Sequence, residues 1–529
     1  MIIHAKFSKL YINYFEILIF LVFISLRLYF ATSQPIFFDS FEYLERLSDP
    51  NFLHALFSGH PPLHSGYIFI LWPIYQFAKL FLSNPTDLVI SFQILVNGIS
   101  MLALYNLITK LWNKKIASIS LLIILLLPLL WISQMTLMME GLYVALFIIS
   151  LNAFNNYLSD KSYYSLVVSL CCWVLSLAVH IGVLLWIPLF LYLLLYHKAK
   201  SKLTIITLFS FTTVLVFLIM GYLTGLRLGI SPLSGLRFFL FTKTGEHANF
   251  ELQINSILIF IRNIIVPTFY NNTVLISLLV LISLFNRKQK HLLLLWLWIL
   301  PTILVNQWWD SLFFGRHALI VILAMAILVA LLIKNKTHLV LGILIYLVIA
   351  TIPSLAKLRN DSPYINFAQK SAQIPLPNLL ICDHFSYPLM QRYYKGEIIS
   401  VNEPGWSKNG LVSEINKKIN SNIPVYILST ALSEPYGLYN GPFLHSLSLS
   451  YKKDFDLKKD LQGYQFVPYL EINKKDNLVI YQITKGGKSG FPEIVKLSRS
   501  TRRLDYYDPL MQIWYKILAY NDKVKLIGQ

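Results

Sequence analysis

The sequence predicts a polytopic α-helical membrane protein of about eleven spans with a C-terminal extracytoplasmic α/β domain. Hydrophobic residues make up 56% of the 529 residues and charged residues only 13%, with a mean hydropathy of +0.58. Apolar runs recur at lengths sufficient to cross roughly 30 Å of hydrocarbon. After residue 355 the charge rises abruptly and short strand-like runs begin. We therefore expect a transmembrane module over 1–355 and a soluble domain over 356–529.

The orientation of the spans follows from the basic residues. Lys and Arg gather in short clusters between the apolar runs, at 6–9, 110–115, Lys161, 197–202, 286–290 and 334–336. Placing every cluster in the cytoplasm satisfies the positive-inside rule. The N-terminus is then cytoplasmic and the C-terminal domain is periplasmic or extracellular. The composition, rich in Lys, Ile and Asn, fits a bacterial inner membrane, although an ER membrane would keep the same topology.

Two apolar segments are predicted to lie in the outer leaflet without crossing it. If 66–82 crossed fully, the cluster at 110–115 would move outside and the later clusters would invert. Pro73 within this segment and Lys79 near its end suit an interfacial helix. The same interpretation applies to 254–270. The first outer loop is therefore expected to extend over 32–87.

The C-terminal domain combines strand-like and helical patterns. Strand-like runs occur at 378–382, 397–401, 425–429 and 478–483. They alternate with helical or turn-rich stretches, which is typical of a small α/β domain. The domain holds 23 Lys and Arg against 15 Asp and Glu, a net charge of +8. This charge favours anionic partners such as lipid head groups or an acidic glycolipid, and no nucleic-acid partner is expected.

Acidic residues of the membrane module concentrate on one face. Eleven precede residue 356, and the topology places all but Glu16 and Asp160 at the outer face. Ionisable groups at membrane depth are costly, so a one-sided collection marks a candidate site. Asp39, shortly after the first span, could accept a proton from an incoming hydroxyl or bind a divalent ion. Glu45 and Asp49 are better explained as the exposed side of a short helix.

A histidine and two prolines open the next apolar segment, in "GHPPLHSGY" (59–67). The prolines fix the entry angle of the following helix and offer no N–H. His60 would be displayed where that helix begins, and could donate to a phosphate or orient a sugar hydroxyl. A helix-start turn with an incidental histidine explains the motif equally well.

The order of these features resembles a known family. An acidic residue soon after the first span, the "D…EY" spacing of Asp39, Glu42 and Tyr43, and "HPPL" resemble the GT-C glycosyltransferases that use polyprenyl-phosphate sugars. The protein O-mannosyltransferases and the lipid A aminoarabinose transferases form the most similar branch. Their first outer loop also contains membrane-associated helices before the second span.

Three later segments resemble the family in the same order. In 131–148, Glu140 occupies the place of an acid before a span. In 176–190, His180 stands where a lysine or arginine is more usual. In 313–332, Arg316 and His317 open a late span. Asp39 is followed by Ser40, whereas many relatives carry an acidic pair, so an adjacent pair cannot hold a metal here.

The resemblance implies a reaction and roles for these residues. A sugar would pass from a polyprenyl-phosphate donor to a lipid, glycan or protein acceptor on the extracytoplasmic face, with inversion and with Asp39 as general base. Sugar or acceptor binding would fall to Glu42, Tyr43, His60 and Glu140. Lipid-phosphate binding would fall to His180, Arg262, Arg316 and His317. A divalent cation, Mg²⁺ or Mn²⁺, would be held by Asp39 and Glu140 if one takes part.

Two other functions stay open. A glycan ligase or polymerase also uses polyprenyl-linked donors. The loop at 224–253, with Arg227, Arg237 and Lys243, keeps this function open. A transporter or flippase of lipid-linked glycans should show inverted repeats and polar residues near mid-bilayer. The sequence shows neither of these features.

Overall fold

The computed structural model describes most of the helical module and the core of the C-terminal domain. The described residues are 14–32, 38–59, 63–199, 201–242, 274–284, 291–305, 319–358, 368–383, 387–401, 408–432, 461–473, 478–486 and 492. The segment 254–270 lies outside them.

Helices make up the described part of the module. The first half contains α1 (Tyr14–Phe30), α2 (Phe38–Ser48), α3 (Phe52–Phe57), α4 (Ser65–Lys79), α5 (Thr86–Leu111), α6 (Lys114–Leu126), α7 (Pro128–Met135), α8 (Met139–Asp160) and α9 (Tyr163–Val179). The second half contains the 3₁₀-helix η1 (Ile181–Trp186), α10 (Ile187–Tyr196), α11 (Lys202–Leu228), α12 (Pro232–Arg237), the π-helix η2 (Phe238–Thr242), α15 (Val274–Leu284), α16 (Leu292–Val305), α17 (Leu319–Ile333) and α18 (Thr337–Leu358). The boundary predicted after residue 355 falls within α18.

Several apolar runs are interrupted where the local chemistry demands it. Leu127 is extended, with ψ of 118°, because the ring of Pro128 disfavours helical geometry in the residue before it. One apolar run therefore becomes α6 and α7. A second apolar run is divided at His180, whose backbone is extended. Helix α9 ends there, and the chain continues through η1 into α10.

The number of membrane spans is the main correction to the prediction. Of the described helices, α5, α8 and α11 are long and apolar enough to cross a membrane. The other apolar helices, such as α9 and α17, are shorter. The prediction of about eleven spans is not met, because breaks such as those at Leu127 and His180 divide runs that the hydropathy pattern reads as continuous. Helix α4, predicted to be interfacial, is not among the three.

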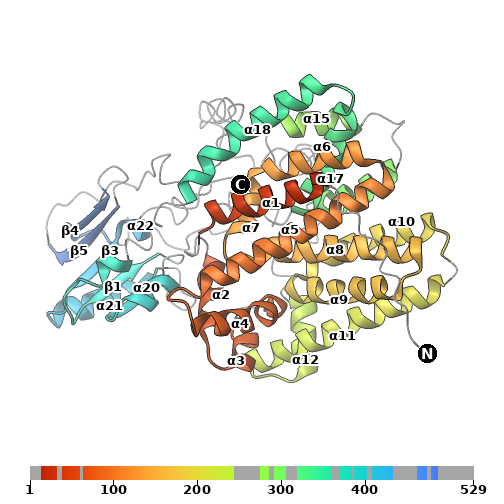
Figure 1. The fold of residues 1–529 in the computed structure, drawn as a ribbon. Helices are drawn as coiled ribbons and strands as arrows, with labels where there is room; N and C mark the ends of the chain where they lie inside the picture. The colour runs from red at the N-terminus through yellow and green to blue at the C-terminus, as the bar shows by residue number, and fades with distance from the viewer. Residues whose placement is uncertain are drawn as a thin grey trace, which may run out of the picture.

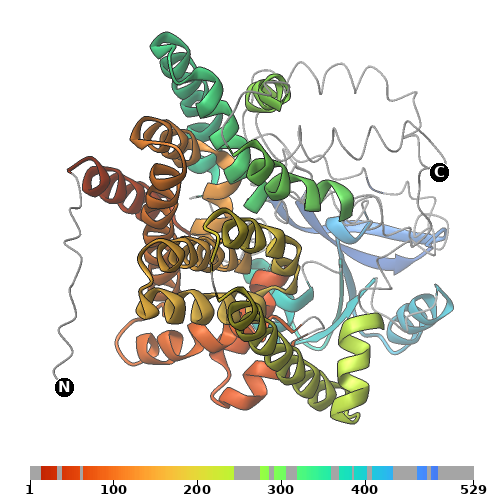
Figure 2. The same cartoon turned by 90° about the vertical axis from the view of Figure 1, so that its right-hand side faces the viewer.

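The helical part has a buried centre and an apolar outer surface. Helix α17 is buried on nearly all sides and contacts α6, α15 and α16. By contrast, α11 exposes large apolar side chains such as Leu203, Phe211 and Leu218. In Figure 1 α11 lies along the lower outer edge of the helical part, and Figure 2 shows the same helices from the side. A helix that is apolar on its outer side is typical of contact with lipid.

The C-terminal domain contains a five-stranded sheet with order β2-β1-β3-β5-β4. Its strands are β1 (Leu379–Cys382), β2 (Glu397–Ser400), β3 (Val425–Leu428), β4 (Tyr464–Asn473) and β5 (Leu478–Lys485). Strands β2, β1 and β3 are parallel, whereas β5 and β4 continue the sheet antiparallel. The helices described with it are α20 (Tyr387–Tyr393), α21 (Lys408–Asn420) and α22 (Ser429–Leu432).

This sheet lies against one end of the helical part. Figure 1 shows it next to the region of α2, and α20 contacts α2 directly. The four predicted strand runs form β1, β2, β3 and β5, which confirms a small α/β unit at the C-terminal end. The end of the module that carries Asp39 on α2 is therefore the end that meets the sheet.

Candidate functional site

A buried arginine fixes the helices of the first outer loop. The guanidinium of Arg46, on α2, donates to the carbonyl oxygens of Ala55 at 2.8 Å, Leu56 at 2.9 Å and Leu63 at 2.7 Å. Burial lowers the pKa of Arg46, and the carboxylate of Glu42 at 3.4 Å acts against that shift. Arg46 therefore ties α2 to α3 and to the turn that leads into α4.

Gly59 leaves room for this ion pair. A Cβ at Gly59 would lie 2.4 Å from both Nη1 of Arg46 and Oε1 of Glu42. Its carbonyl oxygen accepts a hydrogen bond of 3.1 Å from Nε of Arg227, which belongs to α11. The glycine of the "GHPPL" motif thus has a packing role. His60 and the two prolines lie outside the described residues.

An array of aromatic rings joins three segments that are distant in sequence. Tyr67 packs against Tyr43 at 4.7 Å between ring centroids, and Tyr43 meets His64 edge-on at 6.4 Å. The rings of His64 and His180 stack at 5.8 Å, and His180 stacks on Tyr143 at 4.8 Å. These rings come from α2, the start of α4, α8 and the start of η1. Three of the four segments singled out in the sequence, the first outer loop, 131–148 and 176–190, therefore converge here.

Backbone contacts hold the two histidines in place. His64 has a left-handed backbone with φ of 44°, and its Nδ1–H donates to the carbonyl of Val179 at 2.9 Å. Nδ1 of His180 accepts the N–H of Gly182 at 3.1 Å. In the neutral ring the proton of His180 is consequently on Nε2, which is then a donor. Gly66 permits the contact, because a Cβ there would lie 2.4 Å from the carbonyl carbon of Ala178.

Glu140 is fully buried in the first turn of α8, where the helix dipole favours a carboxylate. Burial raises the pKa of the Tyr67 hydroxyl well above its ordinary value, and the charge of nearby Glu140 raises it further. That hydroxyl donates to Oε1 of Gln93 at 3.1 Å. Glu140 therefore lies beside the aromatic array, and Tyr143 is one turn further along the same helix.

Asp39 lies in the first turn of α2 and is partly buried. The hydroxyl of the next residue, Ser40, donates to Sδ of Met138 at 3.2 Å, and Met138 immediately precedes α8. The N-terminal ends of α2 and α8 therefore meet. Since Tyr43 is one turn after Asp39, both face the same side of α2. The structure thus brings Asp39, Glu42, Tyr43, Glu140 and His180 into one region.

Three of the four residues predicted to bind the lipid phosphate, Arg262, Arg316 and His317, lie outside the described residues. The same is true of His60, which is predicted to bind the sugar or acceptor. Their roles stay predictions. Among the predicted phosphate-binding residues, His180 is the one that the described chain places in this region.

A metal does not fit the described donor set. Within the part of the chain that the structure describes, no three His, Cys, Asp or Glu side chains gather to hold a metal ion. Among the described residues, the expected pair Asp39 and Glu140 does not form such a group with a third side chain of these types. We therefore derive no chemical step through a metal.

Sequence reasoning missed a buried cation on α1. Nε of Arg27 donates to Oε1 of Gln134 at 3.2 Å, and Nη2 donates to the carbonyl of Leu125 at 3.1 Å. The guanidinium lies 4.0 Å from the ring centroid of Phe23 and 3.9 Å from that of Trp131. The sequence did contain a signal for this contact, a single arginine inside an apolar helix. A charged residue is costly in lipid, so a buried partner is expected for it. Arg27 ties α7 to α1.

His64, Tyr67 and Tyr143 were also missed as members of the site. Each is an ordinary aromatic residue in an apolar surrounding, and its importance comes only from the contacts across α4, α8 and η1. His64 alone carried a signal, because it follows two prolines and precedes a glycine in "HPPLHSG".

No protein-family model and no curated protein matches the sequence. Solved structures do share its architecture. ArnT from Cupriavidus metallidurans in the apo state aligns with a TM-score of 0.53 and 12% identity, over 88% of this chain and 97% of that chain. ArnT bound to undecaprenyl phosphate aligns over the same shares with a TM-score of 0.51 and 11% identity. AglB from Archaeoglobus fulgidus aligns over 88% of this chain and 75% of that chain, with a TM-score of 0.49 and 9% identity. This chain has the fold of ArnT over most of both chains, which is the GT-C fold that the sequence predicts.

Proposed function

We propose that this chain is an integral-membrane glycosyltransferase. It moves a sugar from a polyprenyl-phosphate donor to a lipid, glycan or protein acceptor on the extracytoplasmic face. The fold that it shares with ArnT, a protein solved with undecaprenyl phosphate bound, supports this proposal. A fold alone does not fix a function, so the side chains of the candidate site must also fit the reaction.

One observation carries the proposal. The aromatic array of Tyr67, Tyr43, His64, His180 and Tyr143 joins three of the four segments whose motifs resemble the family. Asp39 and Glu140 open the two helices, α2 and α8, that supply Tyr43 and Tyr143. Carboxylates, an imidazole donor and tyrosines thus share one region, as transfer of a sugar from a phosphate requires.

The reaction that we propose is a single displacement. The acceptor oxygen or nitrogen attacks the anomeric carbon of the donor while the bond from that carbon to the phosphate oxygen breaks. The bonding electron pair leaves with the phosphate, and attack from the opposite face inverts the carbon. Asp39 takes the proton that the acceptor loses.

The departing lipid phosphate needs donors where its charge develops. Nε2–H of His180 is one such donor, because Nδ1 already accepts the N–H of Gly182. The stacked rings of His64 and Tyr143 restrict the orientation of this imidazole. Arg262 and Arg316 are proposed to supply the permanent positive charge that a neutral imidazole lacks, with His317 as a further donor.

The dimensions of α8 support a site at one membrane surface. Its 22 residues extend for about 33 Å at 1.5 Å per residue. Glu140 is in its first turn, while Asp160 ends it and pairs with Lys110 at 3.6 Å. That length matches the hydrocarbon thickness of roughly 30 Å. The candidate site and the basic loops are therefore proposed to lie at opposite surfaces, with the basic loops in the cytoplasm.

The test is a transfer assay with purified protein and a short-chain polyprenyl-phosphate monosaccharide. We expect the single sugar to appear on an acceptor and the polyprenyl phosphate to be released in equal amount. A protein that consumes only lipid-linked oligosaccharides is instead a ligase or polymerase. A protein that moves the intact donor between leaflets of a vesicle without releasing phosphate is a transporter, and either result contradicts the proposal.

A further inference from the structure

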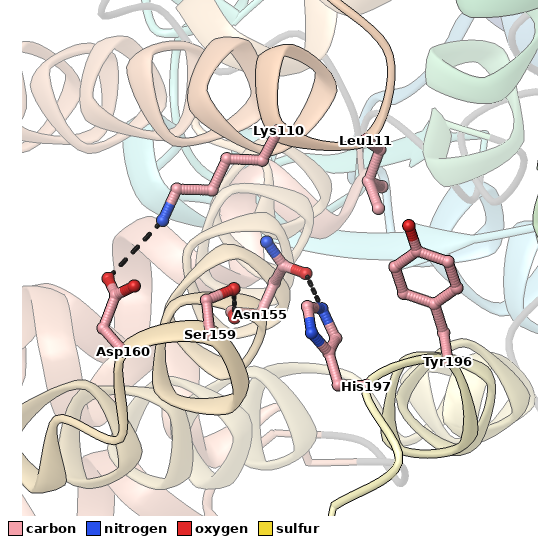
Figure 3. A pocket seen from close by; sticks show the side chains of 7 residues that line it. All are labelled: Lys110, Leu111, Asn155, Ser159, Asp160, Tyr196 and His197. Atoms are coloured by element: carbon pink, nitrogen blue, oxygen red, sulfur yellow. Dashed lines mark hydrogen bonds and ion pairs between the residues drawn. The ribbon is translucent and has the colours of Figure 1, made fainter.

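A polar pocket lies at the end of the module opposite the candidate site. Its volume is about 270 Å³, and it opens where α5, α8 and α10 end. Its polar lining consists of Lys110, Asn155, Ser159, Asp160, Tyr196 and His197 (Figure 3). Because α8 extends for about 33 Å between the two places, this pocket takes no part in the proposed sugar transfer.

Asn155 offers a buried donor to the pocket. The residue is 1% exposed, and its Oδ1 accepts a hydrogen bond of 2.9 Å from Nε2 of His197. Its Nδ2 has no hydrogen-bond partner among the described residues. In Figure 3 this nitrogen points away from His197, into the space beneath Lys110. A buried N–H group without an acceptor destabilises the fold, so an acceptor atom is expected at this point.

The surroundings of the pocket favour negative charge in a ligand. Nζ of Lys110 donates to Oδ1 of Asn156 at 2.7 Å and lies 3.6 Å from Asp160. Burial lowers the pKa of His197, and the charges of Lys161 and Lys110 lower it further. The positive charges of Lys110 and Lys161 near His197 therefore outnumber the single negative charge of Asp160. The Asp160 side chain is 64% exposed and already pairs with Lys110.

We infer that this pocket binds a phosphate group, with Nδ2 of Asn155 and the ammonium of Lys110 as its principal donors. A phosphate offers several acceptor oxygens and so meets the unpartnered amide and the lysine together. The side chain of Tyr196 lines the same space, and its hydroxyl can donate as well (Figure 3). The inference stands independently of the proposed function.

Two sources of phosphate fit this chemistry, a phospholipid head group and a soluble phosphate ester. Tyr163 and Tyr164, the first residues of α9, are 79% and 78% exposed. Leu195, next to Tyr196 in α10, and Leu203, in the first turn of α11, are likewise exposed. Exposed tyrosines next to lysines are typical of the head-group level of a membrane. The experiment therefore has one arm for each source.

Full-length protein purified in detergent tests the inference. One arm measures binding of inorganic phosphate by calorimetry, and the other measures retention of added phosphatidylglycerol by native mass spectrometry. Lys110→Met is expected to weaken binding about tenfold in whichever arm detects binding by the unchanged protein. Lys115→Met, an exposed lysine of the neighbouring helix, should change binding less than about twofold.

Asp160→Asn is expected to strengthen binding, because it removes the carboxylate that repels the anion. This variant guards against a folding defect, since a damaged protein does not bind more tightly. Phosphatidylglycerol retained without phosphate binding identifies a lipid head group, and phosphate binding alone identifies a soluble ligand. Binding in neither arm, or equal losses for Lys110→Met and Lys115→Met, overturns the inference.

Discussion

The imidazole rings of His64 and His180 stack in parallel, with 5.8 Å between their centroids and 2° between their planes. His64 caps the N-terminus of α4, and His180 lies between α9 and η1. Tyr143 of α8 also stacks on His180, with 4.8 Å between the ring centroids. His180, a residue of the predicted phosphate site, is thus stacked on two other rings, so its orientation is restricted before any substrate binds.

His180→Phe should separate the packing role of this ring from its donor role. The phenyl ring can still stack on His64 and Tyr143, but it cannot donate to a phosphate oxygen. We expect sugar transfer to fall by roughly 10-fold to 100-fold, with little change in melting temperature. His338→Phe, at an exposed position of α18, is the control and should retain full transfer. Equal transfer by both variants would show that His180 only packs.

Gly66→Ala should loosen the contact between α4 and α9. The added methyl would lie 2.4 Å from the carbonyl carbon of Ala178 and 2.6 Å from the nitrogen of Val179, and neither backbone atom can move easily. The expected cost is about 1–3 kcal/mol, seen as a lower melting temperature. Gly342→Ala on α18 is the matched control, since a Cβ there meets nothing within 4 Å. Alanine should stabilise that helix by up to about 1 kcal/mol.

Arg46→Lys should destabilise the first outer loop although the charge is kept. The planar fork of Arg46 reaches the carbonyls of Ala55, Leu56 and Leu63, and a single ammonium cannot reach all three. Carbonyls left without donors cost about 1–3 kcal/mol each, and the unfolding temperature should fall accordingly. Lys79→Arg at the end of α4 serves as the control. An unchanged melting temperature for Arg46→Lys would contradict the role assigned to its fork.

The pair of Asp49 and His54 predicts a loss of stability in acid. Burial raises the pKa of Asp49, but the His54 ring and the N–H of Asn51 lower it more, so the folded value lies below the ordinary value of 3.8. The unfolded chain then binds more protons, and the contribution of this carboxylate is lost as pH falls through its folded pKa. Melting temperatures at pH 5 and pH 3 should differ less for Asp49→Asn than for the unchanged protein. An identical difference in the two proteins would refute this role.

The C-terminal strands could be predicted because they are short buried runs rich in Ile, Leu and Val. Strand β4 was missed, since its sequence "YQFVPYLEIN" contains Pro468 and alternates with polar residues. The pairing with β5 shifts register directly after Pro468, which is where a proline is tolerated in an edge strand. Hydropathy likewise identified the helical module but not its breaks, which depend on Pro128 and on the conformation of His180.

The site was predictable only in part. Asp39, Tyr43, Glu140 and His180 were each predicted from local motifs, and the structure brings them into one region. Their supports could not be found in this way, because Gly66 and Arg46 matter through atoms supplied by other helices. A sequence gives the order of such residues along the chain, whereas the contact of His64 with Val179 depends on how α4 and α9 pack.

The most direct test of the account is sugar transfer by Asp39→Asn, compared with Asp49→Asn. Both variants remove one carboxylate from the first outer loop, but only Asp39 is proposed to accept the proton of the acceptor. We predict that Asp39→Asn lowers transfer by roughly 10²-fold to 10⁴-fold while the purified protein stays monodisperse, and that Asp49→Asn keeps nearly full transfer. Transfer by Asp39→Asn at the level of the unchanged protein would contradict the central claim.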